Sequence, residues 1–364
     1  MPRFFRIFGQ GLGAKRGSMR KNLVLGTLLC LWLAAAVPQV GFSQAANSGS
    51  WTKIYEGSNI TYLFIQDDQN LWAVGENTTI FSSTDGGRTW QKRHEGGVAW
   101  LSDIFMYDHR TGWAVGSGGT ILATADGGKT WAPQQGIGAT DYNCVYFSDA
   151  NHGFIGAGAG AILHTEDGGK KWTAQQFKFP APAKTSAGGS PTTPPPPNAM
   201  RHLHFADSDH AMLLKDNDRV MISDNGGKNW RVSGFPEGFT FDELYVRGGS
   251  AWLAGGRKLA SGTVIASLWY SVDAGKTWKP VNSAKPLIHS IDSLWFADEQ
   301  NGMISVDGKL YRTTDGGVNW TVFYAAEDKV RRIFARDLNN IWAIIGGAIY
   351  RYAPATSAQA NPSQ

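Results

Sequence analysis

Cysteine, charged residues and long apolar runs are all scarce in this sequence of 364 residues. Of its 2 cysteines, Cys30 lies in the leading segment, so Cys144 is left without a partner for an internal disulfide. Charged residues make up 18% of the chain and hydrophobic residues 42%. That balance excludes both a disordered chain and a polytopic membrane protein. The fold must therefore be held by an ordinary core without disulfides.

The net charge of +4 does not indicate a nucleic-acid partner. Six of the 34 basic residues lie in residues 1–45, a stretch that contains no Asp or Glu. The remaining 28 Lys and Arg are balanced by 30 Asp and Glu, which leaves a net charge of −2 for the rest of the chain. Binding to nucleic acid through bulk positive charge is therefore disfavoured.

Residues 1–45 have the pattern of a secretory signal peptide. A basic stretch ends at residues 20–21, an apolar run covers residues 23–37, and Ser-Gln-Ala at residues 43–45 is a small-residue cleavage site. The apolar run of 15 residues is shorter than the roughly 18 that a membrane span needs. We expect a cleaved signal and an exported protein. An uncleaved N-terminal anchor is the alternative.

Glycine and tryptophan are abundant, with 45 and 15 copies. Many of them fall in a box related to Ser/Thr-x-Asp-x-Gly-x-Thr-Trp, which occurs six times at steps of 41, 41, 58, 48 and 42 residues. A period near 42 is typical of one four-stranded propeller blade. The third residues of the boxes are Asp85, Asp126, Asp167, Asn225, Asp273 and Asp315. The closing residues are Trp90, Trp131, Trp172, Trp230, Trp278 and Trp320.

A second repeat counts seven units instead of six. Each box follows an apolar strand, a turn led in most units by Asp, and a second strand, and a seventh pair of such strands follows the last box. The seventh unit has no box, but residues 51–55 resemble the segment after each box Trp. We therefore predict an all-β, seven-bladed β-propeller with Asp-box repeats over residues 46–355, its ring closed by the N-terminal strand. Residues 356–364 are expected to form a flexible tail.

The boxes are interpreted as structural. Their hydroxyl and carboxylate groups are suited to bind N–H groups of their own turn, the glycines to supply its backbone angles, and the Trp to pack on the neighbouring strand. Asn225 agrees with this, because an amide caps a turn but is no general base. A sialidase would also carry a Phe/Tyr-Arg-Ile-Pro motif, whereas the near match at residues 5–8 lies in the leading segment and lacks the Pro.

No catalytic or metal-binding set stands out. The sequence has no phosphate loop, nucleophile elbow or Cys/His metal cluster. His202 and His204 share one face of a strand, but His204 falls in a column of aromatic residues and no third ligand is evident. Cys144 is expected to be an inert buried thiol. We therefore expect no enzymatic activity, no metal and no cofactor.

The beginnings of the first strands are expected to line the mouth of the central channel. Arg201, Arg331 and Arg332 form a basic group there, and an acidic group is formed by Asp103, Asp242, Glu243 and Asp292. Mutual neutralisation of the two groups, which would only keep the channel solvated, is an open alternative. Two insertions open on the same face, a Pro-rich segment at residues 179–198 and a loop in the fifth blade. Because loops on a rigid scaffold often bind partners, Arg257 and Lys258 of the fifth-blade loop join Arg201, Arg331 and Arg332 as the candidate partner-binding residues.

With these features the chain resembles the box-repeat propellers of the photosystem II stability and assembly factor family. The resemblance covers residues 46–364 and rests on the blade count, on Gly-Trp-Ala-Val-Gly at residues 112–116, and on the box at residues 124–131. It implies a non-enzymatic protein that binds a membrane-protein client in the periplasm, or in the thylakoid lumen of a photosynthetic host. The protein is then expected to be a monomer, at most peripheral to the membrane, with basic residues on one face holding the client.

Two alternatives stay open at this point. One is a polysaccharide-active glycoside hydrolase, for which Asp242 and Asp292 are the least implausible pair of carboxylates. The other is a carbohydrate-binding propeller that uses exposed aromatic side chains.

Overall fold

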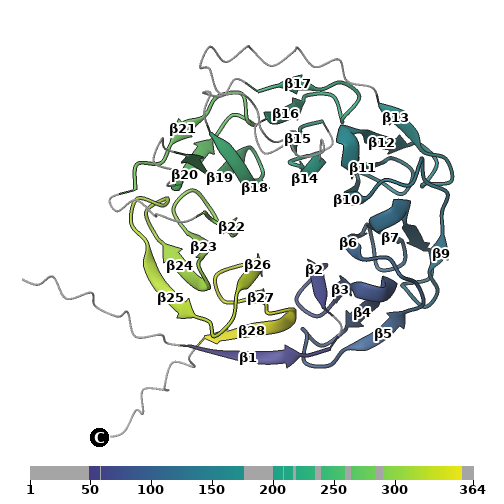
Figure 1. The fold of residues 1–364 in the computed structure, drawn as a ribbon, viewed down its shortest axis with the longest axis horizontal. Coiled ribbons are helices and arrows are strands. Elements are labelled where there is room, and N and C mark those ends of the chain that lie inside the picture. The colour runs from purple at the N-terminus through teal and green to yellow at the C-terminus, as the bar shows by residue number, and fades with distance from the viewer. Residues whose placement is uncertain are drawn as a thin grey trace, which may run out of the picture. The chain divides into compact units, whose positions relative to one another are not determined.

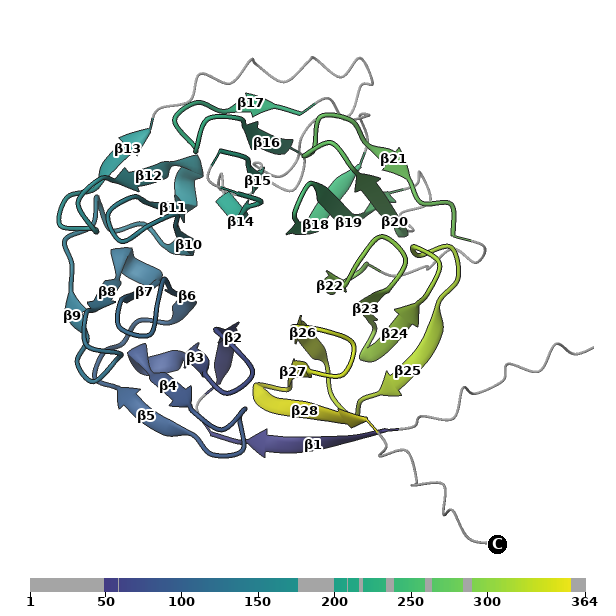
Figure 2. The same ribbon diagram turned by 180° about the vertical axis from the view of Figure 1, so that it is seen from behind.

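The structure is a computed structural model that describes residues 49–57, 59–175, 200–207, 209–215, 219–233, 239–258, 264–283 and 290–354. Over these ranges the strands form seven four-stranded antiparallel sheets, placed in chain order around a centre (Figures 1 and 2). The predicted all-β, seven-bladed propeller is confirmed. The predicted signal peptide (1–45), Pro-rich insertion (179–198) and tail (356–364) lie outside the described residues. Within the described part of the chain, no helical segment has the length and hydropathy of a membrane span.

Each blade runs from an inner strand at the centre to an outer strand at the rim. The inner strands are β2 (Ile60–Ile65), β6 (Leu101–Met106), β10 (Tyr142–Phe147), β14 (Met200–Phe205), β18 (Thr240–Arg247), β22 (Ser293–Phe296) and β26 (Val330–Ala335). The second strands are β3 (Leu71–Gly75), β7 (Gly112–Gly116), β11 (Gly153–Ala157), β15 (Ala211–Lys215), β19 (Ser250–Lys258), β23 (Gly302–Val306) and β27 (Ile341–Ile345). The third strands are β4 (Ile80–Ser83), β8 (Ile121–Thr124), β12 (Ile162–Thr165), β16 (Arg219–Ser223), β20 (Val264–Ser271), β24 (Lys309–Thr313) and β28 (Ala348–Pro354). The outer strands are β5 (Gln91–His94), β9 (Ala132–Pro133), β13 (Thr173–Gln175), β17 (Arg231–Val232), β21 (Lys279–Pro280), β25 (Thr321–Ala325) and β1 (Gly49–Tyr55). Three 3-10 turns, η1 (Glu76–Thr78), η2 (Ser117–Gly119) and η3 (Gly158–Gly160), join second to third strands.

The hydrophobic core lies between neighbouring blades. The second strand β7 is buried along its whole length, because a sheet covers each of its sides. Aromatic rings connect the blades there: Trp113 stacks on Phe147 of the next blade with centroids 3.4 Å apart, and Trp252 stacks on Phe296 at 4.6 Å. Such pairs bury large apolar areas, so each blade is stabilised mainly by its two neighbours.

The ring is closed by strand pairing between the two ends of the chain. β1 pairs antiparallel with β28, with Gly49 opposite Pro354 and Trp51 opposite Tyr352. The Trp51 ring stacks on Tyr324 at 5.2 Å, which anchors the strand to blade six as well. The predicted closure is confirmed, and it supplies blade seven with the outer strand that its own sequence lacks.

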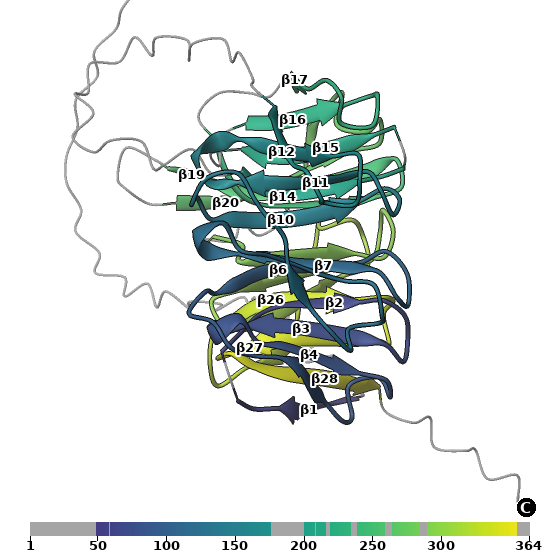
Figure 3. The ribbon, with the colours of Figure 1, turned by 90° about the vertical axis from the view of Figure 1, so that its right-hand side faces the viewer.

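The strand directions give the ring two different faces, seen edge-on in Figure 3. The box face carries the turns between first and second strands and the turns between third and fourth strands. The mouth face carries the starts of the inner strands, the turns between second and third strands, and the connections from blade to blade. β19 and β20, with 9 and 8 residues, make the fifth hairpin longer at its mouth-face end than the 5-residue β7 and 4-residue β8 of blade two.

Six of the seven inner strands contain a bulge close to the mouth face. The register slips at Thr61, Ser102, Asn143, His202, Asp242 and Arg331. In blade four the slip falls on His202, one residue nearer to the apolar part of the strand than in the others, and His202 has a positive φ of 46°. The bulge therefore turns His202, and not Arg201, out of the ladder of β14.

Candidate functional site

The six boxes form the turns between third and fourth strands on the box face. In blade two, the Thr124 hydroxyl donates to Asp126 Oδ1 at 2.9 Å and accepts the N–H of Gly128 at 2.9 Å. Asp126 Oδ1 also accepts the N–H of Thr130 at 3.0 Å. The same three bonds recur at Asp85, Asp167, Asp273 and Asp315, and at Asn225 through its amide oxygen.

Hydrogen bonds also keep the box carboxylates ionised. The Thr130 hydroxyl and then the Thr130 N–H lower the pKa of Asp126 to about 2, and Thr89 acts in the same way on Asp85. A carboxylate with this pKa carries no proton to donate at neutral pH. Each box acid is thus engaged in its own turn.

The second glycine of a box contacts the preceding blade. Gly128 has a φ of 71°, and a Cβ added there would lie 2.3 Å from the ring of Trp72 in blade one. Gly227 faces Phe154 and Gly275 faces Met212 in the same way. The box Trp131 meets Trp72 edge-on at 6.0 Å. These turns therefore pack blade against blade, because only a residue without a side chain fits at the contact.

The turns between first and second strands are also internally bonded. In blade one, Asp67 Oδ1 accepts the N–H groups of Gln69 and Asn70, both at 2.8 Å. The same pattern occurs at Asp108, Asp149, Asp207, Asp298 and Asp337. On the box face, the turn carboxylates of both types thus stabilise backbone turns.

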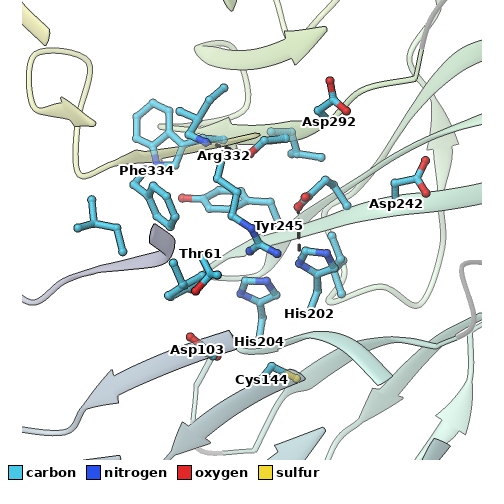
Figure 4. A pocket seen from close by; sticks show the side chains of 18 of the residues that line it. Thr61, Asp103, Cys144, His202, His204, Asp242, Tyr245, Asp292, Arg332 and Phe334 are labelled. Carbon is cyan, nitrogen blue, oxygen red and sulfur yellow. Dashed lines mark hydrogen bonds and ion pairs between the residues drawn. The ribbon is translucent and has the colours of Figure 1, made fainter. Parts of the chain in front are cut away.

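A cavity of about 810 Å³ opens in the middle of the ring, lined by the inner strands (Figure 4). Its lining combines acids, histidines, Cys144 and the cation of Arg332 with aromatic side chains such as Tyr62 and Phe334. A concave, mixed polar and apolar site of this size is the usual place for a ligand or partner segment.

The acids of this cavity have partners. Asp103 is buried, and its two carboxylate oxygens accept the N–H groups of Ile104 at 2.8 Å and of Val145 in the next blade at 2.9 Å. Burial raises its pKa to about 7, although these bonds and the Arg332 charge act the other way. Glu243 lies 3.5 Å from His202, and Asp292 pairs with Lys329 at 2.9 Å. Asp103 therefore connects two blades, and the other two acids have cationic or ionisable neighbours.

Arg332 is the one Lys or Arg among the described residues that lines the cavity. Figure 4 shows its guanidinium group pointing from β26 into the cavity, toward His202 and His204. The guanidinium carbon Cζ lies 5.4 Å from the ring centre of Tyr62, which makes a cation–π contact. Within the described part of the chain no carboxylate lies within ion-pairing distance of it. The site thus holds a partly buried positive charge that a negative group can satisfy.

The other predicted basic residues are spread over the mouth face. Arg331 is the bulged, exposed neighbour of Arg332. Arg257 is exposed near the end of β19, 6.0 Å from the Phe239 ring. Arg201 pairs with Leu214 and Lys258 with Val264 through the backbone, and their side chains lie outside the described part. The structure therefore brings Arg331 and Arg332 together at the channel.

The histidines of β14 do not form a metal site. Burial, first of all, lowers the pKa of His204 to about 4, so its ring is neutral near pH 7. Its ring meets Tyr245 edge-on at 6.4 Å, in the aromatic column of the inner strands. The described residues contain no group of three His, Cys, Asp or Glu side chains with metal-binding geometry. Burial also raises the pKa of the Cys144 thiol to about 12, which keeps it protonated.

The carboxylate pair of the hydrolase alternative lies at the edge of the cavity. Asp242 and Asp292 stand on the opposite side from Asp103 (Figure 4). Asp292 is engaged by Lys329, and its side chain is 20% exposed. Asp103 has a pKa near neutrality, but both of its oxygens are bonded to backbone N–H groups. Of these acids, Asp103 is therefore held by backbone N–H groups of two blades and Asp292 by Lys329.

Sequence reasoning missed an apolar feature next to the cavity. Val98, Trp100 and Ile137 are exposed on the mouth face, and Trp100 lines the cavity. They lie in connections between blades, where no periodic pattern marks a buried or an exposed position. The one signal in the sequence was Trp100 itself, a tryptophan placed in a connection outside the strand and box patterns.

A comparison with protein families finds a match to the family described as "Photosynthesis system II assembly factor YCF48", over residues 98–187 and 195–349. A curated relative, photosystem II assembly protein Ycf48 of Synechococcus sp. (strain JA-3-3Ab), is 29% identical over 77 residues. This alignment spans 20% of the chain and 23% of that relative's length.

Solved structures with the same fold include two YCF48 proteins. YCF48 bound to D1 peptide has a TM-score of 0.64 and 18% identity, and the match covers 85% of this chain and 96% of that one. YCF48 from Cyanidioschyzon merolae also has a TM-score of 0.64, at 17% identity over 84% of this chain and 100% of that one. A GH74 xyloglucanase from Xanthomonas campestris reaches 0.63 at 14% identity, over 86% of this chain and 54% of the enzyme. Identities this low show the common fold.

Proposed function

We propose that this chain, which belongs to the family of the photosynthesis system II assembly factor YCF48, is an exported, non-enzymatic propeller that binds a membrane-protein client during its assembly. One observation carries the proposal. Arg332 projects a cation without an ion pair among the described residues into the central cavity, and Arg331 lies exposed beside it. A solved YCF48 propeller holds a D1 peptide, which supports a protein segment as the ligand here. Charge-assisted hydrogen bonds from arginine to a client carboxylate supply the attraction.

The test is mild crosslinking of the tagged protein in its own cells, followed by affinity capture and mass spectrometry. We expect a membrane-complex subunit with the wild type and its loss from the Arg331→Glu/Arg332→Glu variant. Lys129→Glu/Lys170→Glu, which reverses two exposed charges on the box face, is the matched control and is expected to keep the client. A folded Arg331→Glu/Arg332→Glu variant that keeps its client overturns the role of these arginines.

The hydrolase alternative has its own experiment. Soluble polysaccharides, xyloglucan among them, are incubated with the protein and released reducing ends are measured. The proposal expects no release. Turnover that Asp242→Asn abolishes would reject the non-enzymatic function, and retention on an immobilised polysaccharide without a captured protein would favour a carbohydrate-binding propeller.

Export and a monomeric state belong to the same proposal. The charge pattern and apolar run of residues 1–45 support a cleaved signal. The intact mass of the protein isolated from its host is expected to match a chain that begins after residue 45. Light scattering in solution is expected to give the mass of one chain. A mass that includes residues 1–45 would favour the anchor instead.

A further inference from the structure

Three large apolar side chains are exposed in the two mouth-face connections that flank turn η2 of blade two. Val98 is 96% exposed, Trp100 45% and Ile137 39%. We name them the apolar ledge. Val98 and Trp100 lie between β5 and β6, Ile137 between β9 and β10, and the turn η2 separates the two connections. The other large exposed apolar side chains of the described residues are Tyr107, Val232, Val272, Val318 and Val322, which belong to other turns and strands.

Hydrogen bonds fix the backbone under Val98 and Trp100. The carbonyl of Ala99 accepts the N–H of Thr78 at 2.8 Å. The N–H of Trp100 donates to Ser117 Oγ at 3.0 Å, and its carbonyl accepts the N–H of Ser117 at 2.9 Å. The connection is therefore tied to turns η1 and η2 on both sides. The backbone that carries its apolar side chains is held in place, which lowers the entropic cost of binding to them.

The backbone of Ile137 is fixed from the other side. The buried hydroxyl of Tyr142 accepts the N–H of Ile137 at 2.8 Å and donates to its carbonyl at 3.0 Å. The following residue reaches η2, where the carbonyl of Gly138 lies 2.6 Å from the place of a Cβ on Gly119. The two halves of the ledge thus flank one rigid turn, and exposed apolar groups that are held in this way are typical of binding surfaces.

The ledge continues into the cavity of Arg332. Trp100 and Arg332 line the same cavity of about 810 Å³. The acids nearest to the ledge in sequence are engaged, since Glu95 pairs with Lys92 at 2.7 Å and Asp141 accepts the N–H of Gly118 at 2.9 Å. One cavity is therefore lined both by Trp100 of the ledge and by a cation without an ion pair among the described residues, and this combination defines the ligand.

We propose that the ledge and Arg332 together recognise an extended client segment in which an aromatic or large aliphatic side chain lies within a few residues of a carboxylate. The apolar side chain seats on Val98, Trp100 and Ile137, and the carboxylate reaches Arg332. This inference rests on the proposed function and specifies the chemistry of its client. Apolar contact supplies most of the affinity, and the charge pair fixes the direction of the segment.

The experiment uses the full chain in its own host, with Val98 replaced by the photo-crosslinker p-benzoylphenylalanine. Val272, 53% exposed on the box face, receives the same replacement as a control. We expect an adduct at position 98, and not at 272, with the same membrane protein that capture recovers. The crosslinked peptide should contain Asp or Glu within a few residues of the attachment point. The Arg332→Gln variant should lower the adduct yield roughly tenfold, as expected for loss of a buried charged contact.

A second variant separates binding from folding. Val98→Ser changes a fully exposed side chain, so its unfolding midpoint should equal that of the wild type, while client capture falls about fivefold. An adduct at 98 with another copy of the chain or with lipid overturns the inference in favour of that occupant. A client that is captured normally but crosslinks only from position 272 overturns the ledge and leaves the proposed function intact. Failure to capture any client with the wild type rejects the proposed function itself.

Discussion

The box face and the mouth face are built from the same strands, yet their turns differ in kind. On the box face, six turns repeat the hydrogen bonds of Thr124, Asp126 and Gly128, and their second glycines contact the preceding blade. On the mouth face, Val98 and Trp100 are exposed in the connection between β5 and β6, and Arg331 is exposed near the start of β26. Polar groups that are bonded within their own turn stabilise the ring, whereas groups left without such bonds are available to a partner. The comparison therefore separates a face that maintains the fold from one that can bind.

The largest expected effect on the free energy of unfolding comes from replacing one glycine on each face and comparing the two losses. Gly128→Ala places a methyl group against Trp72 at a φ of 71°, so we expect the free energy of unfolding to fall by about 3 kcal/mol. Gly118→Ala on the mouth face has a similar φ of 64° but no atom within 4 Å of the new methyl group. It should lose about 1 kcal/mol from backbone strain alone. Denaturant unfolding of both variants measures the difference, and equal losses would contradict a packing role for the box glycine.

A smaller effect comes from a threonine of each face. Thr124→Val removes a buried hydroxyl that accepts the N–H of Gly128 and donates to Asp126, which should cost about 2 kcal/mol. Thr120→Val removes a half-buried hydroxyl that donates to the Ser117 carbonyl at 2.8 Å, and the loss should stay below about 1 kcal/mol. Thermal or chemical unfolding decides. A larger loss at Thr120 would mean that mouth-face turns stabilise the ring as much as boxes do.

The channel between the faces should show two opposed effects of pH on stability. Asp103 has a folded pKa of about 7, above its unfolded value, so its contribution is present below pH 4 and is lost as the pH rises to 7. His204 has a folded pKa of about 4, below its unfolded value, so its contribution is present above pH 6.5 and is lost as the pH falls to 4. Compared with the wild type, Asp103→Asn should gain stability with rising pH over this window, and His204→Phe should lose it. Unfolding series from pH 4.5 to 7.5 test both, and parallel curves for all three proteins would refute the assignment.

The smallest expected effect is on the chemical modification of the Cys144 thiol in the channel wall. Cys144 is buried and its pKa is raised to about 12, so an alkylating reagent should leave it unmodified at pH 8 in the folded protein. Modification should appear in denaturant, with the unfolding curve as its control. Rapid labelling of the native protein would show that the channel wall opens.

The sequence predicts the box face well and the mouth face poorly. Box turns are local chemistry, so their residues and period predict the four-stranded blade, and the strand repeat beside them predicts seven blades and the closing strand at Trp51. The bulge at His202 depends on how β14 pairs with β15, which no local pattern encodes. The inward direction of Arg332 beside an exposed Arg331 depends on a bulge in the same way. The ledge was missed because exposure is decided by what neighbouring connections leave uncovered.

The seam between β1 and β28 has a mechanical consequence. Gly49 is paired with Pro354, so the strand pair begins where both chain ends leave it, and Tyr55 is paired with Ile349 at its far end. Tension between the two termini therefore acts on the Gly49–Pro354 pair first and then on each following pair in turn. Strands loaded in this way peel apart one hydrogen bond at a time instead of shearing together. The ring should thus open at low force when pulled by its ends, and at blade seven before any blade that carries a box.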